Sequence, residues 1–118
     1  MYTSFTQMPV WKTAFDLSTE IFELTSNLPK SEDYGLTSQI RRSANSVGAN
    51  ISEGFGRVTG NDKAYFYVVS RGSAYETKHH LRYGCAVGYF DKEVVEKLIK
   101  QYQDLINSLN KIIKTMKS

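Results

Sequence analysis

The chain has 118 residues, of which 41% are hydrophobic and 23% charged, as in a soluble globular domain that is large enough to bury its own core. A single cysteine excludes an internal disulfide framework, and no apolar run approaches the roughly 18 residues of a membrane span. The net charge of +3 favours acidic partners only weakly, and the absence of signal-peptide features predicts a cytoplasmic protein with no membrane contact.

The first predicted element is a helix over residues 9–28. Pro9 stands at a first-turn position that tolerates proline, and Leu28-Pro29 ends the pattern. Apolar residues between these ends recur at alternating spacings of four and three, which is a heptad seam. They are Val10, Ala14, Leu17, Ile21, Leu24 and Leu28.

The middle of the chain predicts two more helices, over residues 36–58 and 62–87, with a break near Thr59-Gly60-Asn61. Asn61 or Asp62 is expected to cap the second of them. The run from Tyr65 to Val69 has strand-like composition, but the sequence offers no partner strand, so a helix is favoured. One helical face of residues 36–58 collects the apolar side chains of Leu36, Ile40, Ala44, Val47, Ile51, Phe55 and Val58.

The last predicted helix covers residues 91–116, with Asp91 placed to cap it and lysines in its final turns. Short connections make neighbouring helices antiparallel, so the sequence predicts an all-α, up-down-up-down four-helix bundle that forms one domain over residues 1–118. The apolar seam of the last helix consists of Val95, Leu98, Tyr102, Leu105, Leu109, Ile112 and Met116.

The glycine-containing stretch from Gly48 to Arg57, GANISEGFGR, superficially suggests a phosphate-binding loop. A P-loop requires a lysine directly after its last glycine and a preceding strand, and neither is present. A dinucleotide fingerprint fails as well, because Gly60 is one residue late and no βαβ unit is predicted. We therefore favour a steric role, in which small side chains let another helix approach closely, within the bundle or across a subunit boundary. These small residues include Ser43, Ser46, Ala49 and Asn50.

The stretch YGLTSQIRRSANSVGANISEGFGR, followed by SRGSAYE, resembles the bacterial four-helix-bundle family known as 23S rRNA intervening-sequence protein. The resemblance covers residues 9–115, and the family's usual ANIAEG has Ser52 in place of alanine. It implies a cytoplasmic bundle that assembles as a homopentamer, with no assigned enzymatic activity. The chain is also similar to the accessory protein of diversity-generating retroelements, which implies work with a reverse transcriptase and nucleic acid.

Charged residues in the two middle helices predict a structural polar network between helices or subunits, formed by Arg41, Arg42, Glu53 and Glu76. Glu76 falls on the expected inward face of its helix, where a carboxylate needs a cationic partner. A metal-binding alternative uses Glu76 and His79, which have the Glu-x-x-His spacing of di-iron bundles. That pattern requires the motif on two helices, and His79 and His80 are the only histidines, so one chain cannot complete it.

Four basic residues of the 62–87 helix fall within one stripe about 100° wide, which includes Tyr67 and Tyr75. Such a stripe favours phosphate binding, and tyrosines can stack on exposed bases. We therefore expect a non-enzymatic scaffold, without a cofactor, that associates with RNA or DNA. The alternatives are a protein–protein adaptor, whose stripe is only a solvated face, and the metal-binding bundle. The basic residues are Lys63, Arg71, Lys78 and Arg82.

Surface that four helices cannot all cover predicts a homo-oligomer. Phe15 and Phe22 lie off the seam of the first helix, and a second apolar row lies beside the seam of the last helix. Contiguous exposed apolar surface usually marks an interface. The second row consists of Ile99, Ile106 and Ile113.

Overall fold

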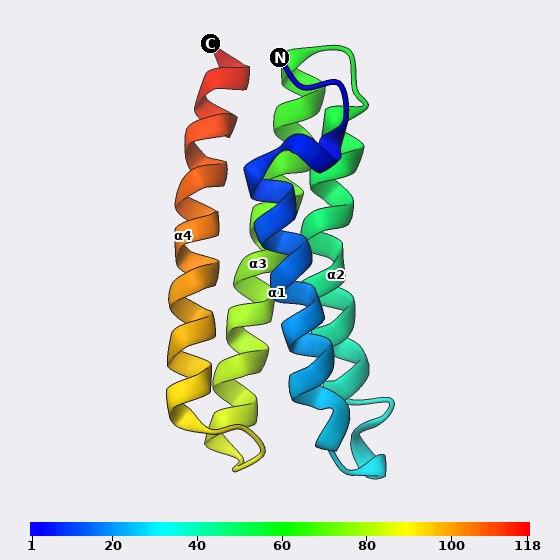
Figure 1. Ribbon diagram of the computed structural model, residues 1–118, viewed down its shortest axis with the longest axis vertical. Helices are drawn as coiled ribbons and strands as arrows, with labels where there is room; N and C mark the ends of the chain where they lie inside the picture. The colour runs from blue at the N-terminus through cyan, green and yellow to red at the C-terminus, as the bar shows by residue number, and fades with distance from the viewer.

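Four long helices run antiparallel in the computed structural model, which describes residues 1–118 (Figure 1). The helices are α1 (Pro9–Leu24), α2 (Leu36–Phe55), α3 (Gly60–Ala86) and α4 (Lys92–Lys117). Short 3₁₀ helices cover Phe5–Gln7, Thr25–Asn27 and Lys30–Glu32. The chain contains no strand, so the all-α bundle and its up-down-up-down order are confirmed. Both termini lie at the same end of the bundle (Figure 1).

Two helix ends differ from the sequence prediction. α1 gives way to a 3₁₀ turn after Leu24, four residues before the expected end. α2 ends at Phe55, with Gly56 as its C-cap, so Val58 lies outside the helix and is almost fully exposed rather than part of its apolar face. Gly54 and Gly56 weaken the helix here, because glycine is a poor helix former.

The N-caps were predicted correctly for α4 and wrongly for α3. The Val94 amide donates to the Asp91 carboxylate at 3.2 Å, as expected. In α3, however, the capping side chain is Thr59, whose hydroxyl accepts from the Asp62 amide at 3.1 Å. Threonine is a good N-cap, and α3 begins at Gly60, so Asn61 already lies inside the helix.

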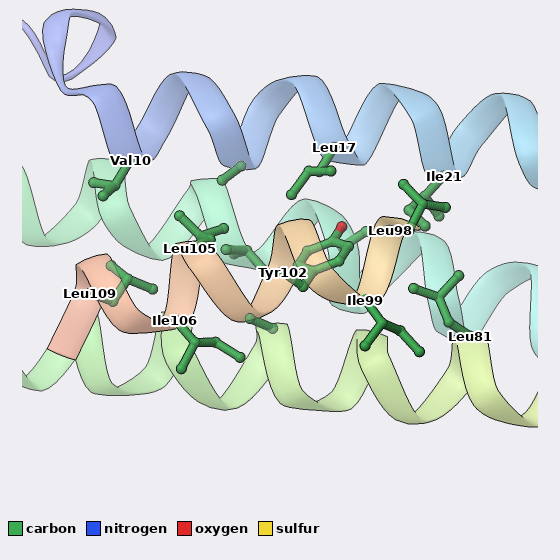
Figure 2. Close-up of a cluster of buried hydrophobic side chains, with 14 of the residues drawn as sticks. Val10, Leu17, Ile21, Leu81, Leu98, Ile99, Tyr102, Leu105, Ile106 and Leu109 are labelled. Carbon is green, nitrogen blue, oxygen red and sulfur yellow. The ribbon is translucent and has the colours of Figure 1, made fainter. Parts of the chain in front are cut away.

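The core runs along the axis of the bundle, and α4 contributes the largest share of it (Figure 2). Tyr102, Leu105 and Leu109 are buried toward the centre. The second apolar row of α4, Ile99, Ile106 and Ile113, is also buried, and the side chains of Ile99 and Ile106 extend toward α3 in Figure 2. The expectation that this row helps to form an outer interface was therefore wrong, because α4 packs against α3 as well as α1 and buries a wide face.

The α2–α3 seam is the most extensive of the helix contacts, and small polar residues line it. The Ser43 and Thr77 hydroxyls share a hydrogen bond of 2.8 Å, and the Ser70 hydroxyl donates to the Val47 carbonyl at 2.8 Å. These hydroxyls are buried and satisfied, so they let the two backbones approach without leaving polar groups unpaired. No helix combines the length and the hydrophobicity that a bilayer span requires.

Candidate nucleic-acid interface

The basic stripe of α3 lies beside α4, and two of its cations are held by neutral amides of that helix. The Arg71 guanidinium donates from Nη1 to Asn110 Oδ1 at 2.8 Å. The Lys78 ammonium donates to Gln103 Oε1 at 2.6 Å. Both cations are half-buried, and no carboxylate pairs with either of them. They are therefore fixed in place without being neutralised.

The other two cations of the stripe have partners that reduce their availability to a ligand. Arg82 forms an ion pair with Glu96 across the α3–α4 seam, at 2.9 Å between Nη1 and Oε2. The Lys63 ammonium donates to the Phe55 carbonyl at 2.7 Å and to the Gly54 carbonyl at 3.4 Å. It caps the C-terminus of α2, where the helix dipole favours a positive charge. The uniform stripe predicted from sequence thus divides into one cation whose charge is paired, Arg82, and three that are held by neutral oxygens, with Lys63 at the end of α2 and Arg71 and Lys78 against α4.

Only one of the two tyrosines expected to stack on bases is accessible. Tyr67 is 2% exposed, and burial raises the pKa of its phenol, so it is unavailable to an extended ligand on this face. Tyr75 is half exposed, and the Lys78 ammonium lies 5.2 Å from the centre of its ring. The expectation for Tyr67 was wrong because the close contact between α2 and α3 turns this side chain inward.

The sequence argument missed the amides of α4 that orient the cations. Gln103, Asn107 and Asn110 recur at spacings of four and three, which places them in one row on the helix. The Gln103 amide also donates to Asn107 Oδ1 at 3.0 Å. A polar row of this kind beside an apolar seam was the signal that could have identified them.

Part of the predicted polar network is present between α2 and α3. Arg42 Nη2 lies 3.7 Å from Glu76 Oε2, and the same carboxylate oxygen is 3.3 Å from Nε2 of the buried His80. The Arg42 and Glu76 side chains are 71% and 42% exposed, so this pair is not the buried one that the sequence suggested. Exposed pairs of this kind contribute little to stability.

The other two members of the predicted network lie elsewhere in the chain. Arg41 donates from Nε to the Thr25 hydroxyl at 2.7 Å and from Nη2 to the Phe22 carbonyl at 3.2 Å, both toward the end of α1. Glu53 pairs with Arg57 at 2.8 Å. The four residues do not meet. Arg41 and Arg42 are consecutive, so their side chains point about 100° apart around α2, and Glu53 lies about three turns further along the helix than Arg42.

The metal alternative gains no support from the arrangement within the chain. Glu76 contacts His80, four residues later, and not the exposed His79. No group of three or more histidine, cysteine, aspartate or glutamate side chains is placed to hold a metal ion.

The GANISEGFGR stretch packs within the bundle at its two buried glycines, whereas Ala49, which was expected to permit a close helix approach, is exposed. Gly54 is buried in α2, and a Cβ atom at this position would lie 2.6 Å from Cε1 of Tyr67. Gly48 is buried against the ring of Trp11. The stretch lies in the last two turns of α2 and the turn that follows, not in a strand-to-helix loop, so no phosphate cradle is formed.

Comparison with known proteins agrees with this architecture. The family described as 23S rRNA-intervening sequence protein matches residues 6–111. A crystal structure of a protein of unknown function from the S23 ribosomal protein family of Bacteroides thetaiotaomicron is similar in fold, with a TM-score of 0.80 and 23% identity. The similarity covers 89% of this chain and 98% of that one. None of the curated proteins matches the sequence.

Proposed function

The chain belongs to the 23S rRNA-intervening sequence protein family, and on that premise we propose that it is a non-enzymatic scaffold that binds the backbone of RNA or DNA along the α3–α4 seam. Arg71 and Lys78 are the residues that contact phosphates. Tyr75 lies beside Lys78 and offers a ring on which an unpaired base can stack. Arg82 has a secondary role because Glu96 already compensates its charge, and Lys63 has one because its ammonium caps the end of α2.

The observation that carries this proposal is the neutral character of the groups that hold Arg71 and Lys78. An amide oxygen fixes a cation in one direction and leaves its charge uncompensated. Fixing a long side chain before binding lowers the entropy that is lost when the ligand arrives. The two positions are seven residues apart on α3, or about 10 Å along the helix axis. This spacing allows one nucleic-acid backbone to reach both cations.

The direct test is binding of a fluorescently labelled, mixed-sequence single-stranded RNA, followed by anisotropy between about 50 and 200 mM salt. We expect the affinity to fall steeply with salt, because each neutralised phosphate releases counterions. The Arg71→Glu/Lys78→Glu double variant should bind at least tenfold more weakly than the parent. Its helix content and assembly should be unchanged, since neither side chain is in the core.

A matched control separates a local contact from a general effect of charge. Lys12→Glu/Lys30→Glu makes the same change in net charge at two exposed positions, one on α1 and one at the start of the 3₁₀ helix that precedes α2. This variant should retain most of the parent's affinity. Equal losses in both double variants, or no loss in the Arg71/Lys78 variant, would show that this face is only solvated. The same anisotropy measurement with a duplex DNA of matching sequence shows whether the protein prefers RNA or DNA.

The scaffold is further proposed to assemble through an exposed aromatic surface on α1. Phe15 and Phe22 are 49% and 57% exposed. The Trp11 ring stacks on Phe15 at a centroid distance of 4.9 Å, and the Arg41 guanidinium lies 4.1 Å from the centre of the Phe22 ring. Contiguous aromatic and guanidinium surface is typical of protein interfaces. The pentameric number rests on the family resemblance alone.

This surface also favours the second candidate function, that of an adaptor that docks another polypeptide such as a reverse transcriptase. Light scattering at micromolar concentration should give a multiple of 13.4 kDa for the parent and a lower multiple for Phe15→Ser/Phe22→Ser. Tyr34→Ser, which changes an aromatic residue that is 97% exposed in the loop before α2, is the control. A parent mass of 13.4 kDa would reject self-assembly and leave the adaptor as the better explanation of the surface.

A further inference from the structure

A cavity of about 540 Å³ lies at the end of the bundle that carries both termini. The first turns of α1 and α3 and the last turns of α2 and α4 surround it, together with the first two residues of the chain. Eight of its twelve lining residues are hydrophobic. A volume of this size is in the range of small-molecule sites, which are also mostly apolar with a few polar groups.

The three methionines of the chain all line this cavity: Met1, Met8 and Met116. They come from opposite ends of the sequence and meet only in the folded bundle. Methionine is unbranched and polarisable, and it adapts to flexible apolar ligands. Val10, Ile112, Pro9 and the rings of Tyr2 and Phe55 form the rest of the apolar wall. The wall therefore suits a linear hydrocarbon chain better than a rigid ring system.

The polar groups of the cavity are donors, and no carboxylate lines it. Lys111 is exposed on α4 and takes part in none of the five ion pairs of the chain. Tyr67 is almost completely buried, and burial alone raises the pKa of its phenol, with no contribution from a hydrogen bond to another side chain. Its hydroxyl oxygen is not among the fully buried atoms that lack a partner, so it keeps access to the cavity and can donate to a ligand there. Lys63 uses one or two of its three donors on the end of α2 and keeps at least one.

We propose that this cavity binds an amphipathic carboxylate of the fatty-acid class. The acyl chain lies among the methionines, Val10 and Ile112, and the carboxylate accepts from the Lys111 ammonium and the Tyr67 hydroxyl. Arg71 and Lys78, the main phosphate contacts proposed above, do not line the cavity, and Lys63 is the one residue of the basic stripe that does. The inference does not depend on the proposed scaffold function, and its failure would leave that function untouched.

The test uses the full chain, stripped of bound lipid, and the fluorescent probe 11-(dansylamino)undecanoic acid. We expect saturable binding of one probe per chain, with displacement by laurate below its micellar concentration. Dodecanol has the same chain without the charge, and it should displace the probe at least tenfold less well, because it lacks the charge-assisted hydrogen bond to Lys111. An equal effect of the two competitors would overturn the assignment of a carboxylate.

Two variants test the site itself. Lys111→Gln should weaken laurate about tenfold and leave dodecanol unchanged, whereas Lys114→Gln, which removes an exposed lysine on the next turn that does not line the cavity, should leave both unchanged. Ser108→Phe places a ring at an exposed position on the cavity wall and should abolish the binding of both. Unsaturable binding, or binding that is insensitive to both Lys111→Gln and Ser108→Phe, would overturn the proposal.

Discussion

Replacement of Tyr102 by phenylalanine is expected to stabilise the bundle. Tyr102 is fully buried in α4, and its ring lies in the core near Leu98 and Leu105 (Figure 2). Its hydroxyl is a buried oxygen without a hydrogen-bond partner. The substitution keeps the ring and its packing and removes only the unpaired polar atom.

The size of the effect follows from this burial. A buried hydroxyl without a partner costs about 1–3 kcal/mol relative to water. Removal of the hydroxyl leaves a small void, which offsets part of the gain in stability. We therefore expect Tyr102→Phe to raise the free energy of unfolding by about 1–2 kcal/mol. For a domain of this size, that change corresponds to an increase in Tm of roughly 3–10 °C.

The same residue predicts a dependence on alkaline pH. Burial, and then the charge of Glu20, raise the pKa of Tyr102 well above its ordinary value of 10.0. Below pH 10 the phenol is protonated in both the folded and the unfolded chain, so its ionisation leaves the free energy of unfolding unchanged. The free energy of unfolding falls as the pH rises further, because the unfolded chain then releases a proton that the folded chain retains. The loss is at most about 1.4 kcal/mol per pH unit. The advantage of Tyr102→Phe over the parent should accordingly grow between pH 9 and pH 11.

Urea denaturation followed by circular dichroism measures both effects, at equal protein concentrations because association adds to apparent stability. Tyr65→Phe, at an exposed position on α3, is the control and should change the free energy of unfolding by less than about 0.5 kcal/mol. If Tyr102→Phe proves less stable than the parent by 1 kcal/mol or more, the hydroxyl has a partner and the reasoning is wrong.

The remaining predictions concern the helices themselves and use thermal and urea denaturation. Gly54→Ala should destabilise by about 1–3 kcal/mol, because its Cβ would lie 2.6 Å from the Tyr67 ring. Gly72→Ala, with nothing within 4 Å of the added carbon, should stabilise by up to about 1 kcal/mol. If Gly54→Ala were more stable than Gly72→Ala, the packing assigned to α2 and α3 would be contradicted. Thr59→Ala should lower the free energy of unfolding by about 1 kcal/mol, because it removes the α3 cap, whereas Asn61→Ala should change it little. Equal losses of stability in the two variants would show that Thr59 is not the cap.

The sequence alone determined the number, the type and the order of the helices. The seams of α1 and α4 repeat at spacings of three and four, and this periodicity is a local property that is visible in a single chain. The Asp91 cap is equally local, since its partner is three residues away. The steric explanation of the GANISEGFGR stretch also came from the sequence, by elimination of the alternatives that need a strand, whereas the close contact of Gly54 with Tyr67 came only from the structure.

What the tertiary structure decided was the direction in which each polar or apolar side chain points relative to the neighbouring helices. Periodicity places Ile106 and Arg71 on helix faces, but it does not say which helix lies opposite each face. α3 covers the isoleucine row of α4, and Asn110 of α4 meets Arg71. Arg41 and Arg42 diverge to different neighbours for the same reason. The cavity at the shared end of the bundle is lined by residues more than 100 positions apart, such as Met8 and Met116, which come to one site only when the helices pack together.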